Sequence, residues 1–157
     1  MPVPVTIRIQ SGDFDVARET AALVAGRHDI GAVVSFIGIC RRGEGEAVIS
    51  EMTLEHYPGM AEEEIGRHVD EAKARWPPDG VTVIHRFGRV VPGDNIVLVL
   101  TASAHREAAF AAAEFLMDYL KTNAPFWKSE KRIAGEDERV WVDARDQDDA
   151  AAARWKT

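Results

Sequence analysis

The chain has 157 residues, a formal net charge of −7 at pH 7 and 46 % hydrophobic residues, which suits one folded domain with a hydrophobic core. The acidic balance argues against a binder of nucleic acid or anionic lipid, and the single cysteine, Cys40, excludes an internal disulfide and any multi-cysteine metal site. The sequence shows neither a signal-peptide pattern nor a membrane-spanning run, so we expect a cytoplasmic protein.

The amino-terminal residues predict a strand followed by a helix. Val5–Ile9 alternates between apolar and polar side chains, a period typical of a strand with one buried face. Asp13 or Asp15 can cap the helix that follows, because a carboxylate accepts hydrogen bonds from the free N–H groups of a first helical turn. The apolar residues spaced for the inner face of this helix are Ala17, Ala21 and Val24.

The next segments predict two strands, a loop and a long helix. Gly31–Ile37 is almost continuously apolar and rich in β-branched residues, which predicts a buried strand. Residues 41–46 are polar and contain glycine, which predicts a mobile loop, and a further strand is expected over 48–54. A helix is expected over residues 58–76, where a proline at its start and two prolines after its end mark the limits.

The second half of the chain predicts two more strands and a second long helix. Val81–His85 and Ile96–Leu100 are the strands, and Pro92-Gly93-Asp94 is a turn between them. A helix is expected from His105 to about Thr122, because its apolar residues recur at helical spacing.

The carboxy-terminal region predicts a small hairpin and an acidic tail. Residues 124–127 interrupt the preceding helix, and the segments 128–133 and 139–142 could pair as strands. The tail, about 146–157, is rich in Asp and Ala and predicts a short helix. Because strands and helices are mixed without strict βαβ alternation, we predict a single α+β domain over 1–157, in which a mixed or antiparallel sheet packs with helices.

Several common catalytic motifs are absent from the sequence. It contains no G-x-x-x-x-G-K-[ST], G-x-G-x-x-G, H-E-x-x-H or G-x-S-x-G, and its histidines lack the spacing of zinc ligands. A standard NTPase, dinucleotide enzyme, zinc hydrolase or serine hydrolase is therefore not expected.

A candidate anion site lies at Ser103-Ala104-His105-Arg106, where a predicted strand ends and a predicted helix begins. Free backbone N–H groups and the helix dipole favour an anion at a helix start, and arginine binds phosphate through two hydrogen bonds. The alternative is a structural histidine beside a surface arginine, and the residues alone leave both interpretations open.

A second candidate is the segment in which Lys121 and Lys128 flank the aromatic residues Phe126 and Trp127. An apolar wall lowers the pKa of a lysine and suits it to proton transfer, and aromatic rings stack on a flat heterocycle. Alternatively, the aromatic residues anchor the core and the lysines are solvated.

A third candidate is Arg41-Arg42, which follows a predicted strand and enters a glycine-containing loop, a position suited to binding a ligand. The same pair could keep a sheet edge soluble. Cys40 beside it is better interpreted as a small buried thiol than as a nucleophile. Glu55 and His56 are neighbours on a strand and point to opposite faces, which favours structural roles for them.

Taken in chain order, these segments resemble the large, catalytic subunit family of molybdopterin synthase. Each motif alone is weak, whereas the ordered set is specific and covers most of the chain. The motifs are Phe36–Arg41, Leu54–Met60, Val83–Gly88, Pro92–Asp94, Ser103–Arg106, Met117–Thr122, Ala124–Lys128 and Trp141–Arg145.

The resemblance implies an α/β hammerhead fold and a homodimer of large subunits within a heterotetramer. A small ubiquitin-like sulfur-carrier subunit would dock at each end, and its C-terminal Gly-Gly thiocarboxylate would enter the large subunit's pocket. The implied reaction transfers two sulfurs to cyclic pyranopterin monophosphate and forms the dithiolene of molybdopterin. Because the sulfur arrives on the partner, the large subunit would need no metal, cofactor or cysteine nucleophile of its own.

The resemblance also assigns roles to individual residues. The family's essential lysines match Lys121 and Lys128, which would stabilise a developing oxyanion or protonate a leaving oxygen. Its substrate-binding positions match Arg41, His105 and Arg106, residues that could hold the substrate's phosphate. Residues flanking the matched positions, with backbone or secondary contacts implied, are Ile39, Cys40, Ser129 and Glu130.

Two rival functions fit the same residues. One is a non-catalytic module that binds the tail of a ubiquitin-like protein. The other is an enzyme for a different small phosphate metabolite, although the aromatic wall beside the lysines favours a flat heterocyclic ligand over a sugar phosphate.

Overall fold

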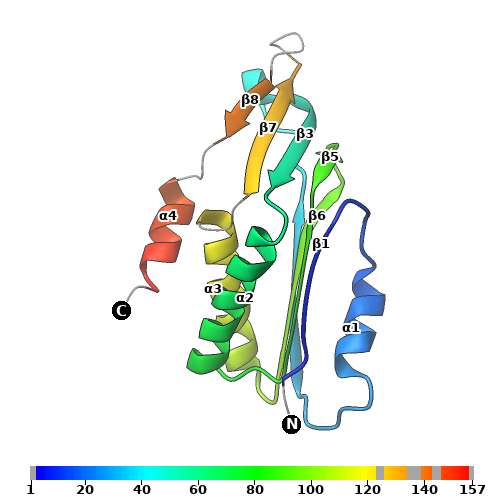
Figure 1. Cartoon of the computed structure of the whole chain (residues 1–157), viewed down its shortest axis with the longest axis vertical. Coiled ribbons are helices and arrows are strands. Elements are labelled where there is room, and N and C mark those ends of the chain that lie inside the picture. The colour runs from blue at the N-terminus through cyan, green and yellow to red at the C-terminus, as the bar shows by residue number, and fades with distance from the viewer. Residues whose placement is uncertain (1–2, 123–125, 134–138, 143–145, 156–157) are drawn as a thin grey trace.

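The computed structural model describes residues 3–122, 126–133, 139–142 and 146–155. Two four-stranded sheets and the helices packed on them form an elongated α+β fold (Figure 1). The predicted fold class is therefore confirmed, and the second sheet lies beyond one end of the first (Figure 1).

The larger sheet has the strand order β1-β4-β6-β2, so that β1 and β2 form its edges. The strands are β1 (Val5–Gln10), β4 (Gly80–Arg86), β6 (Asn95–Ser103) and β2 (Ala32–Ile39). β1 runs parallel to β4, and the other neighbours are antiparallel. The central strands β4 and β6 are buried along nearly their whole length, which explains their almost continuous apolar sequences.

Helices cover both faces of this sheet. α2 (Met60–Arg75) and α3 (Arg106–Thr122) lie on one face, and α1 (Val16–Val24) lies on the other (Figure 1). Each face has its own apolar cluster, one that includes Phe115 of α3 and one that includes Leu23 of α1. The sheet therefore forms the middle layer of the molecule.

The smaller sheet is antiparallel and has the strand order β5-β3-β7-β8. The strands are β5 (Gly88–Val90), β3 (Ile49–His56), β7 (Phe126–Arg132) and β8 (Arg139–Val142). The predicted pairing of the last two strands is confirmed, whereas β5 was not predicted. Of the predicted interruption at 124–127, Phe126 and Trp127 form the start of β7, whereas residues 124 and 125 and the turn between β7 and β8 lie outside the described residues. The 3-10 helix η1 (Gly45–Ala47) occupies the predicted loop before β3.

The predicted inner face of α1 is wrong. Asp15 caps the helix as expected, since its Oδ1 accepts from the Arg18 N–H at 3.1 Å. Ala17 and Ala21 are nevertheless exposed, and Leu23 is the buried residue. The helix is rotated so that the larger leucine side chain reaches the sheet, because its burial removes more apolar area from water than that of an alanine.

The prediction that Gly31–Ile37 forms a buried strand is also wrong. β2 is an edge strand, with Phe36 and Ile37 each 38 % exposed and Ile39 56 % exposed. An apolar run predicts that a strand is buried, but it does not show whether the burying residues belong to the same chain or to a second chain.

The carboxy-terminal segment is anchored on α3. It contains α4 (Asp146–Ala153), which confirms the predicted short helix. The Trp155 Nε1–H donates to the Asp118 carboxylate at 2.5 Å, and Arg154 forms an ion pair with Glu114 at 2.6 Å. The Trp155 ring meets those of Trp76 and Phe115 edge to face, which joins the segment to the main core.

Candidate functional site

Three of the residues predicted for the site lie at the two ends of one helix, α3. His105 and Arg106 lie at the start of α3, and Lys121 lies in its last turn. The rise of an α-helix separates Arg106 from Lys121 by about 22 Å. A single chain therefore brings the predicted residues together as two clusters rather than as one.

The first cluster forms around the two lysines. Lys121 comes from α3 on the larger sheet, and Lys128 comes from β7 of the smaller sheet, paired with Leu54 of β3. Both ammonium groups help to lower the pKa of His85 on β4. Two cations from different layers therefore act on one buried position.

His85 is the nearly buried centre of this cluster, only 6 % exposed. Burial lowers the pKa of its imidazole to about 4, and the positive charges of Lys128 and Lys121 act in the same direction. Its Nδ1 lies 2.8 Å from the backbone carbonyl oxygen of Arg86, which only accepts hydrogen bonds, so Nδ1 carries the proton. The ring is therefore neutral at physiological pH.

Cys40 belongs to the same cluster as a buried thiol. The residue is 2 % exposed. Its backbone N–H donates to the Asp94 carbonyl oxygen, and its own carbonyl oxygen accepts from the Gly93 N–H, both at 2.8 Å. Burial raises the pKa of the thiol, and the charges of Asp94 and Glu130 add to this, whereas Lys128 opposes it. The thiolate needed for nucleophilic attack is thus disfavoured, in agreement with a structural role for Cys40.

The other predicted site residues near the two lysines differ in their exposure to solvent. Ile39 and Arg41 flank Cys40 and are exposed. Glu130 is partly buried and lies 3.6 Å from Arg132. Ser129 is 3 % exposed and points to the sheet face opposite Lys128, because neighbouring residues of a strand alternate. Ser129 could therefore serve the Lys128 face only through its backbone.

The second cluster is exposed at the opposite end of α3. His105 and Arg106 follow the end of β6, where Gly31 donates its backbone N–H to the Ser103 carbonyl at 2.9 Å. A Cβ at position 31 would lie 2.2 Å from the Ala104 carbonyl oxygen, so only glycine fits this contact. The close approach fixes the turn from which the candidate anion-binding residues project.

A stack of rings connects the two sheets beside the lysines. The rings of His85 and Phe126 lie 3.8 Å apart at 14°, and His56 lies 4.8 Å from Phe87 and 6.0 Å from Phe126. His56 thus has the structural contacts expected for it. His85 was not predicted as a site residue, although it lies in the motif Val83–Gly88. The signal that could have identified it is a histidine near the end of an otherwise mostly apolar strand.

Phe126 and Trp127 have different roles. Phe126 packs against the main core, whereas Trp127 is 41 % exposed and meets Tyr57 edge to face at 4.8 Å. The core-anchor interpretation therefore fits Phe126, and Trp127 remains available at the surface.

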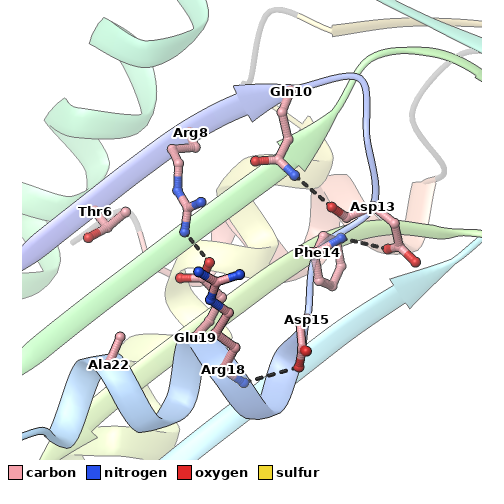
Figure 2. A pocket seen from close by; sticks show the side chains of 9 residues that line it. All are labelled: Thr6, Arg8, Gln10, Asp13, Phe14, Asp15, Arg18, Glu19 and Ala22. Carbon is pink, nitrogen blue, oxygen red and sulfur yellow. Dashed lines mark hydrogen bonds and ion pairs between the residues drawn. The ribbon is translucent and has the colours of Figure 1, made fainter.

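A separate surface hollow of about 580 Å³ lies between β1 and α1 (Figure 2). It contains none of the predicted site residues. Its charges are largely used locally, because Arg8 pairs with Glu19 and Asp15 caps the helix (Figure 2). Within the described ranges, no three side chains form a metal-binding group, and no helix is long and apolar enough to cross a membrane.

Comparison with known proteins matches residues 9–123 to the family described as "MoaE protein". The "Molybdopterin synthase catalytic subunit" of Mesorhizobium japonicum is 62 % identical over 152 residues, which are 97 % of this chain and 94 % of that protein. A solved "Molybdopterin biosynthesis MoaE protein" from Burkholderia ambifaria has 50 % identity and a TM-score of 0.81, covering 98 % of this chain and 99 % of that one.

A more distant solved structure has the same fold. Its title is "Protein-protein complex of subunit 1 and 2 of Molybdopterin-converting factor" from Helicobacter pylori. The identity is 22 % and the TM-score 0.66, with 88 % of this chain and 91 % of that chain covered.

Proposed function

The chain belongs to the MoaE protein family, and from that premise we propose that it acts as the catalytic subunit of a molybdopterin synthase. In this role it transfers sulfur from the C-terminal thiocarboxylate of a small ubiquitin-like subunit to cyclic pyranopterin monophosphate. The product carries the dithiolene of molybdopterin, which belongs to molybdenum cofactor biosynthesis.

The observation that carries the proposal is the pair of lysines at the junction of the two sheets. Lys121 and Lys128 come from different layers, and both act on the same buried imidazole, His85. Paired cations beside a buried region suit a reaction in which an anion attacks and further negative charge develops.

In the proposed reaction, the thiocarboxylate sulfur forms a bond to a substrate carbon while a carbon–oxygen bond breaks. Water then cleaves the bond between this sulfur and the partner's carbonyl carbon, which leaves the sulfur on the substrate and a carboxylate on the partner. Lys121 and Lys128 stabilise the oxyanion that develops or protonate the leaving oxygen. Arg41, His105 and Arg106 hold the substrate phosphate.

The sulfur is proposed to come from the partner rather than from this chain. The buried Cys40 thiol, whose pKa is raised, supports this division of roles. The small partner is further supported by the Helicobacter pylori structure, in which the chain that shares this fold belongs to a complex of two different subunits. A cationic pocket would attract an anionic thiocarboxylate tail.

We propose that each complete site combines residues from two copies of this chain. Arg41 lies at the end of β2 nearest the lysines, whereas His105 and Arg106 lie about 22 Å along α3 from Lys121. One small substrate does not span that distance. A homodimer provides the second cluster from a neighbouring copy, in agreement with the homodimer that the family resemblance implies.

The exposed edge strand β2 supports this arrangement. Phe36, Ile37 and Ile39 on β2 are exposed, as is Phe110 of α3. If two β2 strands meet antiparallel about a two-fold axis, the Ile39 end of one lies against the Ala32 end of the other. Ala32 pairs with Ser103, so this contact brings the second copy's anion-binding turn towards the first copy's Arg41.

The test is turnover by the single variants Lys121→Ala and Lys128→Ala, with thiocarboxylated partner and pterin precursor supplied. We expect each variant to lose about 100-fold or more in turnover, the magnitude typical of removing a group that stabilises developing charge. Lys73→Ala on α2 is the matched control and should retain full turnover, since Lys73 belongs to neither cluster.

The outcomes separate the proposed function from its rivals. Near-normal turnover by both variants, with the fold intact, would sink the assignment of the lysines. If the wild-type chain binds the partner but neither binds nor converts the pterin precursor, it is a non-catalytic module. Turnover of a different phosphate compound in place of the pterin would indicate another metabolite enzyme.

A further inference from the structure

His85 sits where the two sheets meet, on a strand that leaves it little freedom. It lies near the end of β4, where its backbone pairs with Ile9 of β1 and with Val97 of β6. Its side chain is on the same face as the core residue Val83, which is the α2 and α3 side of the larger sheet. The imidazole therefore projects from a fixed backbone towards the smaller sheet.

Two contacts fix the orientation of the ring. Nδ1–H donates to the Arg86 carbonyl at 2.8 Å, and the ring face lies 3.8 Å from Phe126 at an interplanar angle of 14°. Burial keeps the imidazole neutral, so it packs against an apolar ring without the cost of burying a charge.

Phe126 transmits this contact to Lys128. Both residues belong to β7 and are two positions apart, so their side chains share one face of the strand. Lys128 belongs to the smaller sheet, whereas Lys121 is on the helix that covers the larger sheet. The spacing of the two lysines consequently depends on how the sheets are joined, and the His85–Phe126 stack joins them beside both lysines.

We propose that His85 is a positioning residue for the reaction: its ring, stacked on Phe126, fixes the start of β7 and thereby sets Lys128 relative to Lys121. This inference rests on the proposed function of the two lysines. His85 itself transfers no proton in this role and touches no substrate.

Two substitutions separate the ring from its hydrogen bond. His85→Asn retains an N–H donor close to the position of Nδ1 but removes the stacked ring. His85→Phe retains a flat ring against Phe126 but leaves the Arg86 carbonyl without its donor. We expect His85→Asn to lower kcat about 10- to 100-fold, as for other small displacements of reacting groups, and His85→Phe to remain within about 3-fold of wild type.

The matched control is His68→Asn. His68 is a second partly buried histidine, stacked on Tyr119 of α3 at 4.1 Å and 25°, and its pKa is also lowered by burial. It joins α2 to α3 rather than one sheet to the other. We expect His68→Asn to lower thermal stability while kcat stays within about 3-fold of wild type, because the lysine pair is not affected.

A readout independent of turnover is amide hydrogen exchange in β7 of the full chain. We expect His85→Asn to speed exchange at Phe126 and Lys128 about 10-fold or more, and His85→Phe to leave it close to wild type. The exchange result decides the positioning role even if the chain turns over no pterin. Activity in Lys128→Ala would instead contradict the proposed function.

Three results would overturn the inference. The first is His85→Asn with wild-type kcat and unchanged exchange in β7. The second is an equal loss of kcat in His85→Asn and His68→Asn, which would indicate a general loss of stability. The third is His85→Phe failing as severely as His85→Asn, which would show that a ring stacked on Phe126 is not sufficient to position Lys128.

Discussion

At the scale of single residues, burial decides which side chains remain chemically available. Lys128 acts on both Cys40 and His85, and desolvation favours the neutral form of each. Lys121 at the surface and partly buried Lys128 keep contact with solvent. The two ammonium groups are thus available to a charged reactant, whereas the buried thiol and imidazole of this end are held neutral.

The neutral His85 predicts a loss of stability in acid. Its pKa is about 4 in the folded protein and near 6.5 in an unfolded chain, so the unfolded state binds more protons as the pH falls below 6.5. Between pH 7 and pH 5, His85 alone should lower the free energy of unfolding by about 2 kcal/mol. Urea titrations of the wild type and His85→Phe at both pH values measure this contribution.

His85→Phe should lose less stability on acidification than the wild type, by about that amount. His68 contributes in the same direction in both proteins, because its pKa is also lowered, and so it cancels in the comparison. Equal losses in the two proteins would show that His85 is protonated alike in the folded and unfolded states.

Some residues of the candidate site can be predicted from the local sequence, and others cannot. Lys128 and Phe126 could be singled out because two lysines flank aromatic residues, and Arg106 because arginine at a helix start suits an anion. His85 could not be singled out from its neighbours, since its importance comes from a ring supplied by a strand 41 positions later. Local sequence does not specify such long-range contacts.

At the scale of elements, periodicity predicted those that bury a clear face. α2, α3, β4 and β6 were predicted within a few residues of their bounds, because their apolar residues follow helical spacing or form continuous runs. The three residues of β5 are too few to show a period. The wrong face of α1 has a similar cause, because alanines scattered around a helix favour no single orientation.

The anchoring of the carboxy-terminal segment on α3 gives a prediction at this scale. Trp155→Phe keeps a ring against Trp76 and Phe115 but loses the hydrogen bond to Asp118. We expect the free energy of unfolding to fall by about 1.5–3 kcal/mol, the usual contribution of a hydrogen bond to a charged group. Chemical denaturation measures the loss.

A double-mutant cycle isolates this contact. In an Asp118→Ala background, Trp155→Phe should cost clearly less than it does in the wild type, because the acceptor is already absent. Equal costs in the two backgrounds would attribute the effect to ring packing and would contradict the anchoring role of the hydrogen bond.

At the scale of the whole molecule, the two clusters imply that one chain contributes to two sites. The proposed dimer then predicts complementation between inactive variants. In a mixed dimer of Lys128→Ala and Arg106→Ala chains, one site receives both defects and the other receives neither. Random mixing should therefore restore about a quarter of wild-type turnover.

The experiment mixes the two purified variants under conditions that exchange subunits and measures turnover with partner and pterin precursor. Mixing either variant with itself is the control and should restore nothing. If the mixed sample also stays inactive although mixed dimers form, then Lys128 and Arg106 of the same chain serve one site, and the two-copy arrangement is contradicted.

Helix α3 also constrains the number of residues that can separate the two clusters. The helix links Arg106 to Lys121 without interruption, so the number of residues between them sets both their separation and their relative direction. Deleting or inserting one residue there would shift one cluster along the axis by about 1.5 Å and rotate it by about 100° relative to the other. Substitutions on the outer face of α3 are thus tolerable, whereas any change in its residue count would put one of the two sites out of register.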